Sequence, residues 1–271
     1  MSRPIYSLFA MTIAVLSLLL PAGASAEESN PDNEAAWTSI RKDTFGQQEM
    51  IDGKGFLSLE APERAEDAAV VPITIRLTPE LADKIKSLTL VVDENPAPIV
   101  ATFTYGEAAG SGQRILATRI RVDRYTFVRA VAESSDGKFY MTKTFVKASG
   151  GCSAPASRDA EEAAKSIGKM RIRTATATAG KSGLGEVMLR HPNISGLAID
   201  QISGGYPPAR FISHLSVTAG GKLVFAMEGG ISISEDPNFR FSYSAGANDS
   251  LEVTAEDTGG SKFSGRSGSP S

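Results

Sequence analysis

Short runs of alternating apolar and polar residues, separated by turn signals, recur along most of this sequence. In residues 115–122, for example, apolar side chains alternate with Arg119 and Arg121, a pattern typical of a strand with one face toward a core. Residues 134–137, Ser-Ser-Asp-Gly, lie between two such runs and indicate a β-hairpin turn. This repeated pattern leaves little of the chain for helices. It predicts an all-β fold in which sheets pack face to face.

The strand-like runs form two blocks on either side of a glycine-rich stretch that holds the single cysteine. The first block has runs at residues 56–59, 70–77, 88–92, 99–105, 115–122, 126–132 and 139–146. The second has runs at residues 170–174, 185–189, 211–218, 223–227, 239–243 and 251–255. We therefore predict two immunoglobulin-like β-sandwich domains, at residues 44–148 and 170–263, joined at 149–169 by a cysteine-bearing tether and a short helix. Ser157 is the expected N-cap of that helix, and Gly168 its end.

The first 26 residues have the pattern of a secretory signal peptide. Arg3 gives a positive start, residues 5–20 are largely apolar, and Ala24-Ser25-Ala26 fits a cleavage site. The apolar run is short for a membrane anchor, and no second long apolar stretch follows. We therefore expect residues 1–26 to be removed near Ala26 and the mature chain to be exported, with no membrane contact after cleavage.

Both ends of the mature chain are polar. Residues 27–43 are expected to be disordered or to hold a short helix, over Glu34 to Arg41, that carries Trp37. Residues 264–271 are rich in glycine and serine and predict a disordered tail. Charged residues nearly balance, at a net charge of −3, and are not clustered, so the sequence gives no indication of nucleic-acid binding.

Cys152 is the only cysteine in the chain, so it has no partner for an internal disulfide. A lone cysteine usually packs as a small buried apolar residue. Here, however, Gly150, Gly151, Ser153 and Ala154 provide no large apolar side chains beside the sulfur. Because glycine pairs favour flexible segments, we predict an exposed and functional thiol on a flexible tether.

A catalytic role for this thiol lacks support in the sequence. Nucleophilic cysteines need a base within hydrogen-bond reach, and the only histidines are His191, at a loop edge, and His214, within a predicted strand. A thiol-dependent hydrolase that uses either histidine is therefore a remote alternative. The spacing of Cys152 and the two histidines matches no metal site, and no nucleotide-binding motif is present. We predict that the chain is not an enzyme and has neither a cofactor nor a metal.

The order of these features resembles a known family. An exported sandwich, the Gly150-Gly151-Cys152 stretch and a second sandwich resemble a fusion of SoxY and SoxZ, the two subunits of a sulfur-oxidation carrier. The Gly-Gly-Cys stretch is similar to the start of the SoxY arm. The motifs similar to SoxZ are His191-Pro192 with Gly196-Leu197, Pro208-Ala209-Arg210-Phe211-Ile212 and Asn238-Phe239-Arg240-Phe241. The chain most resembles the single-chain SoxYZ-like carriers associated with quinoprotein dehydrogenases, whose tether also reads Gly-Gly-Cys-Ser-Ala-Pro.

The resemblance implies a non-catalytic periplasmic carrier that holds a sulfur-containing group on Cys152, with Gly150 and Gly151 as the hinge of the tether. It implies redox partners such as c-type cytochromes, a thiol-ester or sulfate hydrolase, or a quinoprotein dehydrogenase, and a contact between the two sandwiches. Because Cys152 lies within the chain, its partners would meet a loop and not a free arm. The alternative is a periplasmic interaction module that serves a quinoprotein dehydrogenase system without covalent cargo.

Overall fold

A computed structural model describes residues 34–155, 165–175, 182–200, 203–244, 246 and 250–268. The predicted signal peptide and most of the predicted helix between Ser157 and Gly168 lie outside these residues. Only the end of that helix is described: Lys165 and Ser166 are helical, and a turn follows at Gly168. None of the helices among the described residues combines the length and the apolar character that crossing a membrane would need.

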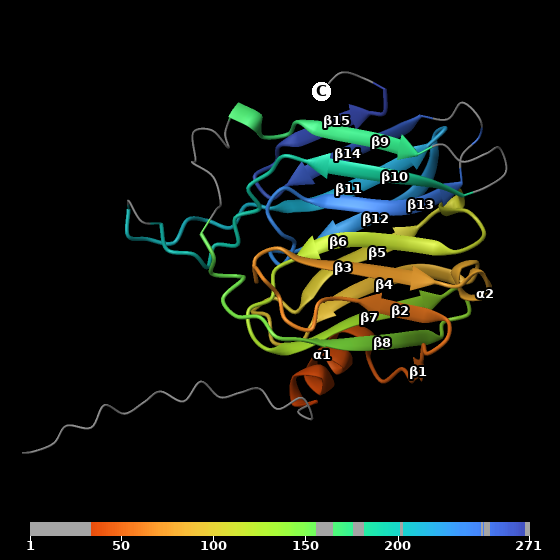
Figure 1. Ribbon diagram of the computed structural model, residues 1–271, viewed down its shortest axis with the longest axis horizontal. Helices are drawn as coiled ribbons and strands as arrows, with labels where there is room; N and C mark the ends of the chain where they lie inside the picture. Colours follow the sequence, from red (N-terminus) through yellow and green to blue (C-terminus); the bar gives the residue numbers. More distant parts are fainter. Residues whose placement is uncertain are drawn as a thin grey trace, which may run out of the picture.

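Two β-sheets form the body of the protein (Figure 1). The nine-stranded sheet has the order β1 (Met50–Asp52), β8 (Phe139–Val146), β7 (Thr126–Ser134), β4 (Ile85–Val92), β5 (Ile99–Tyr105), β12 (Lys222–Gly229), β11 (Ile212–Ala219), β14 (Leu251–Asp257) and β15 (Lys262–Arg266). The six-stranded sheet has the order β2 (Leu57–Glu60), β3 (Val71–Leu77), β6 (Arg114–Ile120), β13 (Asn238–Ser244), β10 (Ser182–Leu189) and β9 (Met170–Ala175). Neighbouring strands are antiparallel apart from β1 and β8.

Both sheets run across the boundary between the first half of the chain, residues 34–155, and the second half, residues 165–268. In the nine-stranded sheet β5 pairs with β12, and in the six-stranded sheet β6 pairs with β13. The predicted all-β class is confirmed, and the chain has two domains. The expected contact between the two halves takes a form that the sequence did not predict, because each sheet continues from one half into the other. The immunoglobulin-like class of each half stays a prediction.

A single apolar core lies between the sheets and contains residues from both halves. Its centre is a cluster of aromatic rings in edge-on contact. Phe103 on β5 lies 5.7 Å from Phe225 on β12 and 6.1 Å from Phe239 on β13, measured between ring centroids. Since Phe103 belongs to the first half and its two partners to the second, burial of these rings stabilises both halves together.

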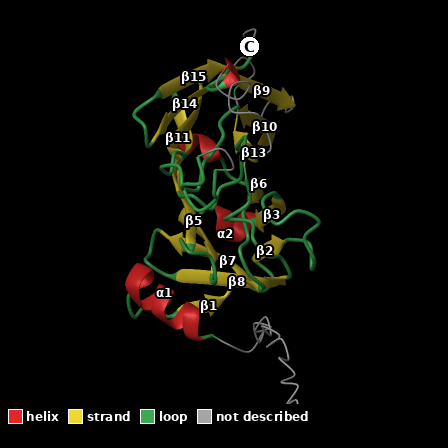
Figure 2. Ribbon diagram, turned by 90° about the vertical axis from the view of Figure 1, so that its left-hand side faces the viewer, coloured by secondary structure: helices red, strands yellow, loops and turns green. Residues whose placement is uncertain are grey.

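The predicted N-terminal helix is present as α1 (Ala35–Phe45), slightly longer than expected. It packs on the outer face of the nine-stranded sheet at the first half (Figure 2), with Trp37 buried against Val91 and Val131. The fully buried Arg129 on β7 stacks 4.5 Å from the Trp37 ring and pairs with Asp93 at 2.8 Å. The stacking of Arg129 on Trp37 thus helps to hold α1 on the sheet, and Asp93 compensates the buried charge of Arg129. The remaining short helices are α2 (Pro79–Ala82) and the 3-10 turn η1 (Glu107–Ala109).

The C-terminal prediction needs correction. Ser264, Gly265 and Arg266, expected to begin a disordered tail, belong to β15 and pair with β14. Backbone hydrogen bonding to a neighbouring strand orders this stretch, although these three residues have no apolar side chain to pack in a core. Residues 269–271 lie outside the described residues.

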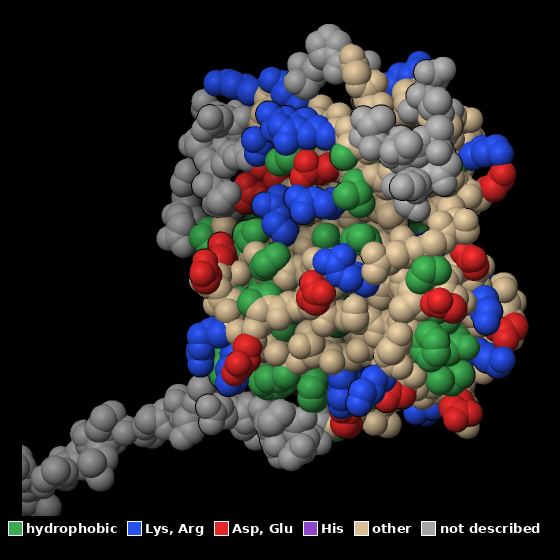
Figure 3. Space-filling view, turned by 45° about the vertical axis from the view of Figure 1, so that its right-hand side comes forward, with side chains coloured by type: hydrophobic (Ala, Val, Ile, Leu, Met, Phe, Trp, Pro, Cys, Tyr) green, Lys and Arg blue, Asp and Glu red, His purple; other side chains and the backbone are tan. Residues whose placement is uncertain are grey.

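The outer face of the six-stranded sheet carries many of the basic side chains (Figure 3). Arg173 on β9 and Arg240 on β13 flank Glu186 on the strand between them, at 3.8 and 3.6 Å. Exposed pairs of this kind contribute little to stability. The fold therefore depends on the shared core and not on its surface charges.

Because the two halves share one core, we expect a destabilising substitution in one half to destabilise the other half as well. Replacing Phe239 with alanine in the second half should cost about 3–5 kcal/mol of unfolding free energy. Trp37, the only tryptophan, reports on the first half through its fluorescence. In denaturant titrations of Phe239→Ala, the Trp37 transition should move to lower denaturant as one step with the circular dichroism transition. The matched control is Phe56→Ala, since Phe56 is 48% exposed. An unchanged Trp37 transition in Phe239→Ala would contradict a shared core.

Candidate functional site: a buried cysteine between the two halves

Cys152 is fully buried, with 0% of its surface exposed, and it is a free thiol. The prediction of an exposed thiol is therefore wrong for this conformation. Its neighbours in sequence do not bury it, as expected from their small size. Segments far away in the sequence cover it instead, and they come from both halves of the chain.

The backbone on either side of the sulfur is held at four points. Gly150 donates its amide hydrogen to the Asp123 carbonyl at 2.8 Å, and Gly151 to the Val122 carbonyl at 3.1 Å. The amide of Cys152 donates to Asp123 Oδ1 at 3.2 Å, and the Ser195 hydroxyl donates to the Cys152 carbonyl at 2.5 Å. Residues 150–152 are thus a docked segment, bound to the loop after β6 in the first half and to Ser195 in the second.

The two glycines have specific positions in this docked segment. Gly150 has a φ of +77°, in the left-handed region that favours glycine. Gly151 lies so close to neighbouring backbone that an added Cβ would be 2.0 Å from the Ala68 carbonyl oxygen. In this conformation the glycines allow a turn and a close approach of two backbones. Their role as a hinge stays a prediction.

Arg121 lies beside the docked segment with only 3% of its surface exposed. Its Nη1 donates to the Gly151 carbonyl at 3.1 Å, and its Nη2 to the Asn193 carbonyl at 3.2 Å. The alternation in residues 115–122 had placed Arg121 on the polar face of a strand. Strand β6 ends at Ile120, however, and the chain beyond it no longer follows the strand alternation.

A second set of polar side chains fixes the loops around the cysteine. Asn95 donates from Nδ2 to the Arg121 carbonyl at 2.8 Å and to Ser232 Oγ at 3.0 Å. Its Oδ1 accepts the Asp123 amide hydrogen at 2.8 Å. Asn95 therefore joins loops from both halves beside Cys152.

Burial, with a smaller contribution from the negative charge of Asp123, raises the pKa of the Cys152 thiol to about 11. The Arg121 charge and a hydrogen bond with Ser232 partly oppose this rise in the pKa. The thiol is therefore protonated at neutral pH in this conformation. Because the thiolate is the nucleophile, the docked cysteine is unreactive.

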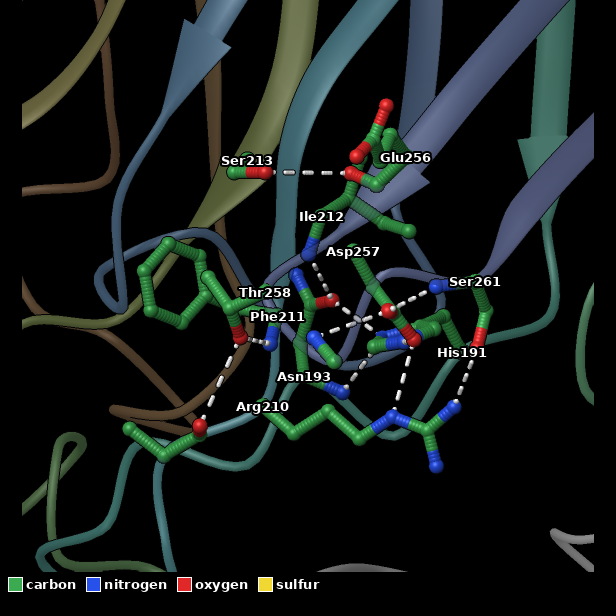
Figure 4. A network of polar contacts seen from close by, with 12 residues as sticks. His191, Asn193, Arg210, Phe211, Ile212, Ser213, Glu256, Asp257, Thr258 and Ser261 are labelled. Atoms are coloured by element: carbon green, nitrogen blue, oxygen red, sulfur yellow. Dashed lines mark hydrogen bonds and ion pairs between the residues drawn. The ribbon is translucent and has the colours of Figure 1, made fainter.

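His191 takes part in a buried network that adjoins the cysteine site through Asn193, whose carbonyl accepts a hydrogen bond from Arg121 (Figure 4). Its Nδ1 lies 2.7 Å from Asn193 Oδ1 and its Nε2 lies 3.2 Å from Asp257 Oδ2. Asp257 also accepts a hydrogen bond from Arg210 Nε at 2.8 Å. Burial lowers the pKa of His191, outweighing the opposite effects of Asp257 and Asn193. Both ring nitrogens are engaged within this network, so His191 does not act as a base toward Cys152 here.

His214 is exposed on β11, where its Nδ1 lies 3.0 Å from Ser213 Oγ. Neither histidine forms a hydrogen bond with Cys152 in this structure. Among the residues with described positions, no group of three His, Cys, Asp or Glu side chains is arranged to hold a metal ion.

Family comparison assigns the two halves. Residues 41–152 match the family of the sulfur oxidation protein SoxY, and residues 170–267 match that of the sulphur oxidation protein SoxZ. The chain is a fusion of a SoxY domain and a SoxZ domain. The pairing of β5 with β12 and of β6 with β13 is therefore an intramolecular contact between SoxY and SoxZ. Both are carrier families without catalytic activity, which confirms that the chain is not an enzyme, and their members are typically periplasmic.

Solved structures show weaker similarities. The sulfur carrier protein SoxY from Chlorobium limicola f thiosulfatophilum is 20% identical, with a TM-score of 0.32, over 42% of this chain and 91% of that one. A β-glycosidase from Bacteroides vulgatus is 9% identical, with a TM-score of 0.25, over 78% of this chain and 24% of the enzyme. Similarities this low support no argument about function. No curated protein matches the sequence.

Sequence reasoning found Cys152 but missed the residues that hold it: Arg121, Asp123, Ser195, Asn95 and Ser232. None of them offered a signal in the sequence. Arg121 follows the alternation of residues 115–122 as a polar-face residue. The others are ordinary loop residues, and only the pairing of the two domains brings them to the cysteine.

The hydrogen bond from Ser195 predicts how readily the thiol becomes exposed. Replacing Ser195 with alanine removes one hydrogen bond of the docked segment, worth about 1 kcal/mol, so the open state should be populated roughly fivefold more. Labelling of Cys152 by an aromatic disulfide reagent should accelerate by the same factor. Ser213→Ala is the control, because Ser213 donates to a backbone carbonyl of the same domain at Glu256. Equal labelling rates in the two variants would show that Ser195 does not hold the segment.

The buried imidazole predicts an acid-sensitive fold. His191 has its pKa lowered from 6.5 in the folded state, so below about pH 6.5 the unfolded chain binds the extra proton more readily. Its contribution to stability is therefore lost as the pH falls from 7 to 5. In denaturant titrations at both pH values, His191→Gln should lose less stability than the native protein over this range, while His214→Gln should lose as much. A native-like pH dependence in His191→Gln would contradict a neutral buried imidazole.

Proposed function

We propose that this protein is a periplasmic carrier that holds a sulfur-containing group covalently on Cys152 while partner redox enzymes act on it. The observation that carries the proposal is the position of the only thiol. The match to SoxY ends on Cys152, and the segment that holds it lies between the SoxY and SoxZ domains. Export to the periplasm would follow cleavage near Ala26, by the pattern of residues 1–26.

Loading would join the Cys152 sulfur to the outer sulfur of a group such as thiosulfate. Forming that disulfide-type bond releases one proton and two electrons, and a c-type cytochrome partner would accept the electrons. A hydrolase that acts on a thiol ester or releases sulfate would then shorten the bound group. A dehydrogenase, such as a quinoprotein dehydrogenase, would oxidise the remaining sulfane sulfur. This chain itself supplies the attachment atom and the segment that presents it.

The buried thiol sets a condition on this function. The sulfur of Cys152 has no exposed surface, so the active site of a partner enzyme cannot reach it, and it is protonated, so it is a poor nucleophile. The docked segment must therefore open before loading. Gly150 and Gly151 are the positions where the backbone would turn on opening, which is the sense in which they serve as a hinge. Opening would also remove the burial that raises the pKa of Cys152, so the thiol becomes more reactive as it becomes accessible.

A second function is favoured by the same burial. A thiol that never leaves the junction would be a structural residue, and the protein would be an interaction module for a quinoprotein dehydrogenase system without covalent cargo. The surface of the two fused domains would then be the functional part. The two functions differ in whether Cys152 is ever modified.

Intact-mass analysis of the protein isolated from its native periplasm separates them. A carrier should show a fraction with the added mass of a sulfur or sulfonate group, and this fraction should vanish in Cys152→Ser together with the sulfur-dependent growth of the host. Cys152→Ser is close in size to the native residue, so the fold should persist. A thiol that is bare under every growth condition, with normal growth of the Cys152→Ser strain, would exclude the carrier.

A further inference from the structure

Arg121 is a buried cation with no carboxylate in ion-pair contact, although the charges of Glu235 and Asp67 act on it from beyond that distance. No carboxylate among the described residues forms an ion pair with it, and its hydrogen bonds from Nη1 and Nη2 go to the neutral carbonyls of Gly151 and Asn193. Its Nε–H is buried and has no hydrogen-bond partner. A buried guanidinium normally needs a paired anion, because removing a charge from water is costly.

The other two deeply buried arginines are compensated in other ways. Arg129 pairs with Asp93 and with Glu34, at 2.8 and 2.7 Å. Arg114 also has an unpartnered Nε, but its guanidinium stacks 4.2 Å from the ring of Tyr105. Among the described residues, no carboxylate forms an ion pair with Arg121 and no aromatic ring stacks on its guanidinium, and the charges of Glu235 and Asp67 act on it only from farther away. Of the three deeply buried arginines in the described part of the chain, Arg121 alone lacks such a direct contact.

This place is the site of the only thiol. Arg121 contacts the carbonyl of Gly151, directly before Cys152. Its other contact, Asn193, is two residues from Ser195, which binds the carbonyl of Cys152. The guanidinium thus lies between the two backbone segments that flank the sulfur. Asp123, whose carboxylate accepts the amide hydrogen of Cys152, forms no ion pair with Arg121.

We propose that Arg121, through its unpartnered Nε–H, binds the anionic terminal group of a sulfur adduct on Cys152 and so holds the loaded segment at the SoxY–SoxZ junction. The ligand class is a sulfonate or an anionic sulfane sulfur, covalently linked to the cysteine. This inference rests on the proposed function, with Cys152 as the attachment point. An anion forms a charge-assisted hydrogen bond with the guanidinium, whereas a neutral adduct of similar size gains no such bond. The loaded carrier would thereby be protected from unrelated thiols while it waits for a partner.

Two adducts that differ in charge test this directly. Cys152 is modified in urea, where access does not limit the reaction, and the protein is then refolded. Tetrathionate converts the thiol to an S-thiosulfonate, with release of thiosulfate and a proton. Methyl methanethiosulfonate gives a neutral methyl disulfide, with release of methanesulfinic acid. The rate at which dithiothreitol restores the free thiol, measured by intact mass and divided by the rate in urea, reports how well each adduct is protected.

In Arg121→Gln the thiosulfonate should be reduced about tenfold faster than in the native protein, as expected for loss of one charge-assisted hydrogen bond. The methyl disulfide should be accelerated by a clearly smaller factor, because it loses only the hydrogen bond from Nη1 to the Gly151 carbonyl that helps to hold the segment. Arg121→Lys keeps the charge and should give a smaller acceleration, again larger for the thiosulfonate than for the methyl disulfide. This variant provides the test if the glutamine variant does not fold. The matched control is Arg114→Gln, which removes an equally buried arginine with an unpartnered Nε away from the cysteine.

Three results would each overturn the proposal. In Arg121→Gln these are equal acceleration of both adducts and no acceleration of either adduct. In Arg114→Gln it is the same preference for the thiosulfonate. These outcomes are distinguishable from failure of the carrier function itself. That failure appears as a bare Cys152 in protein isolated from the periplasm, whereas the adducts here are installed chemically.

Discussion

Two antiparallel strand pairs, β5 with β12 and β6 with β13, carry both sheets across the boundary between the SoxY and SoxZ domains. The second pair continues beyond the strands: Ile120 bridges to Ile233, and the Arg121 amide donates to the Ser232 carbonyl at 2.8 Å. The loops that surround Cys152 are extensions of this pairing. The cysteine site therefore exists only because the two domains share their sheets.

The site combines two properties that oppose each other. Hydrogen bonds from Ser195 and to Asp123 close the segment over a protonated thiol, which suits storage and protection. Covalent loading needs an exposed thiolate, and each hydrogen bond of the docked segment is individually modest. A segment held by a few bonds, on a body held by a large core, is able to open while the body stays folded. Because both ends of the segment belong to the chain, its opening differs from the movement of a free arm.

Local patterns were enough to predict much of the fold. The hairpin at residues 134–137 joins β7 to β8, and the helix around Trp37 is present, because turn chemistry and apolar spacing act within a few residues. The continuous sheets were not predicted, since strand patterns do not reveal which strand of another domain will be the neighbour.

The candidate site shows the same division between local and distant information. The uniqueness of Cys152 is visible in the sequence and marked it out, but its burial is not. Small neighbours leave a sulfur open only if nothing else approaches, and here Arg121, Asn193 and Ser195 approach from loops far along the chain. The burial of Arg121 was missed because strand alternation assigned it to the solvent side, although the strand ends one residue earlier.

The central claim is that the docked segment opens locally, without unfolding of the shared sheets. The rate of Cys152 labelling by a thiol reagent, measured across low denaturant concentrations, tests this most directly. Local opening exposes little surface, so the rate should be nearly independent of denaturant until the global transition begins. A labelling rate that rises with denaturant as steeply as global unfolding, from the lowest concentration onward, would show that the thiol is reached only when the whole protein unfolds. That result would contradict the account.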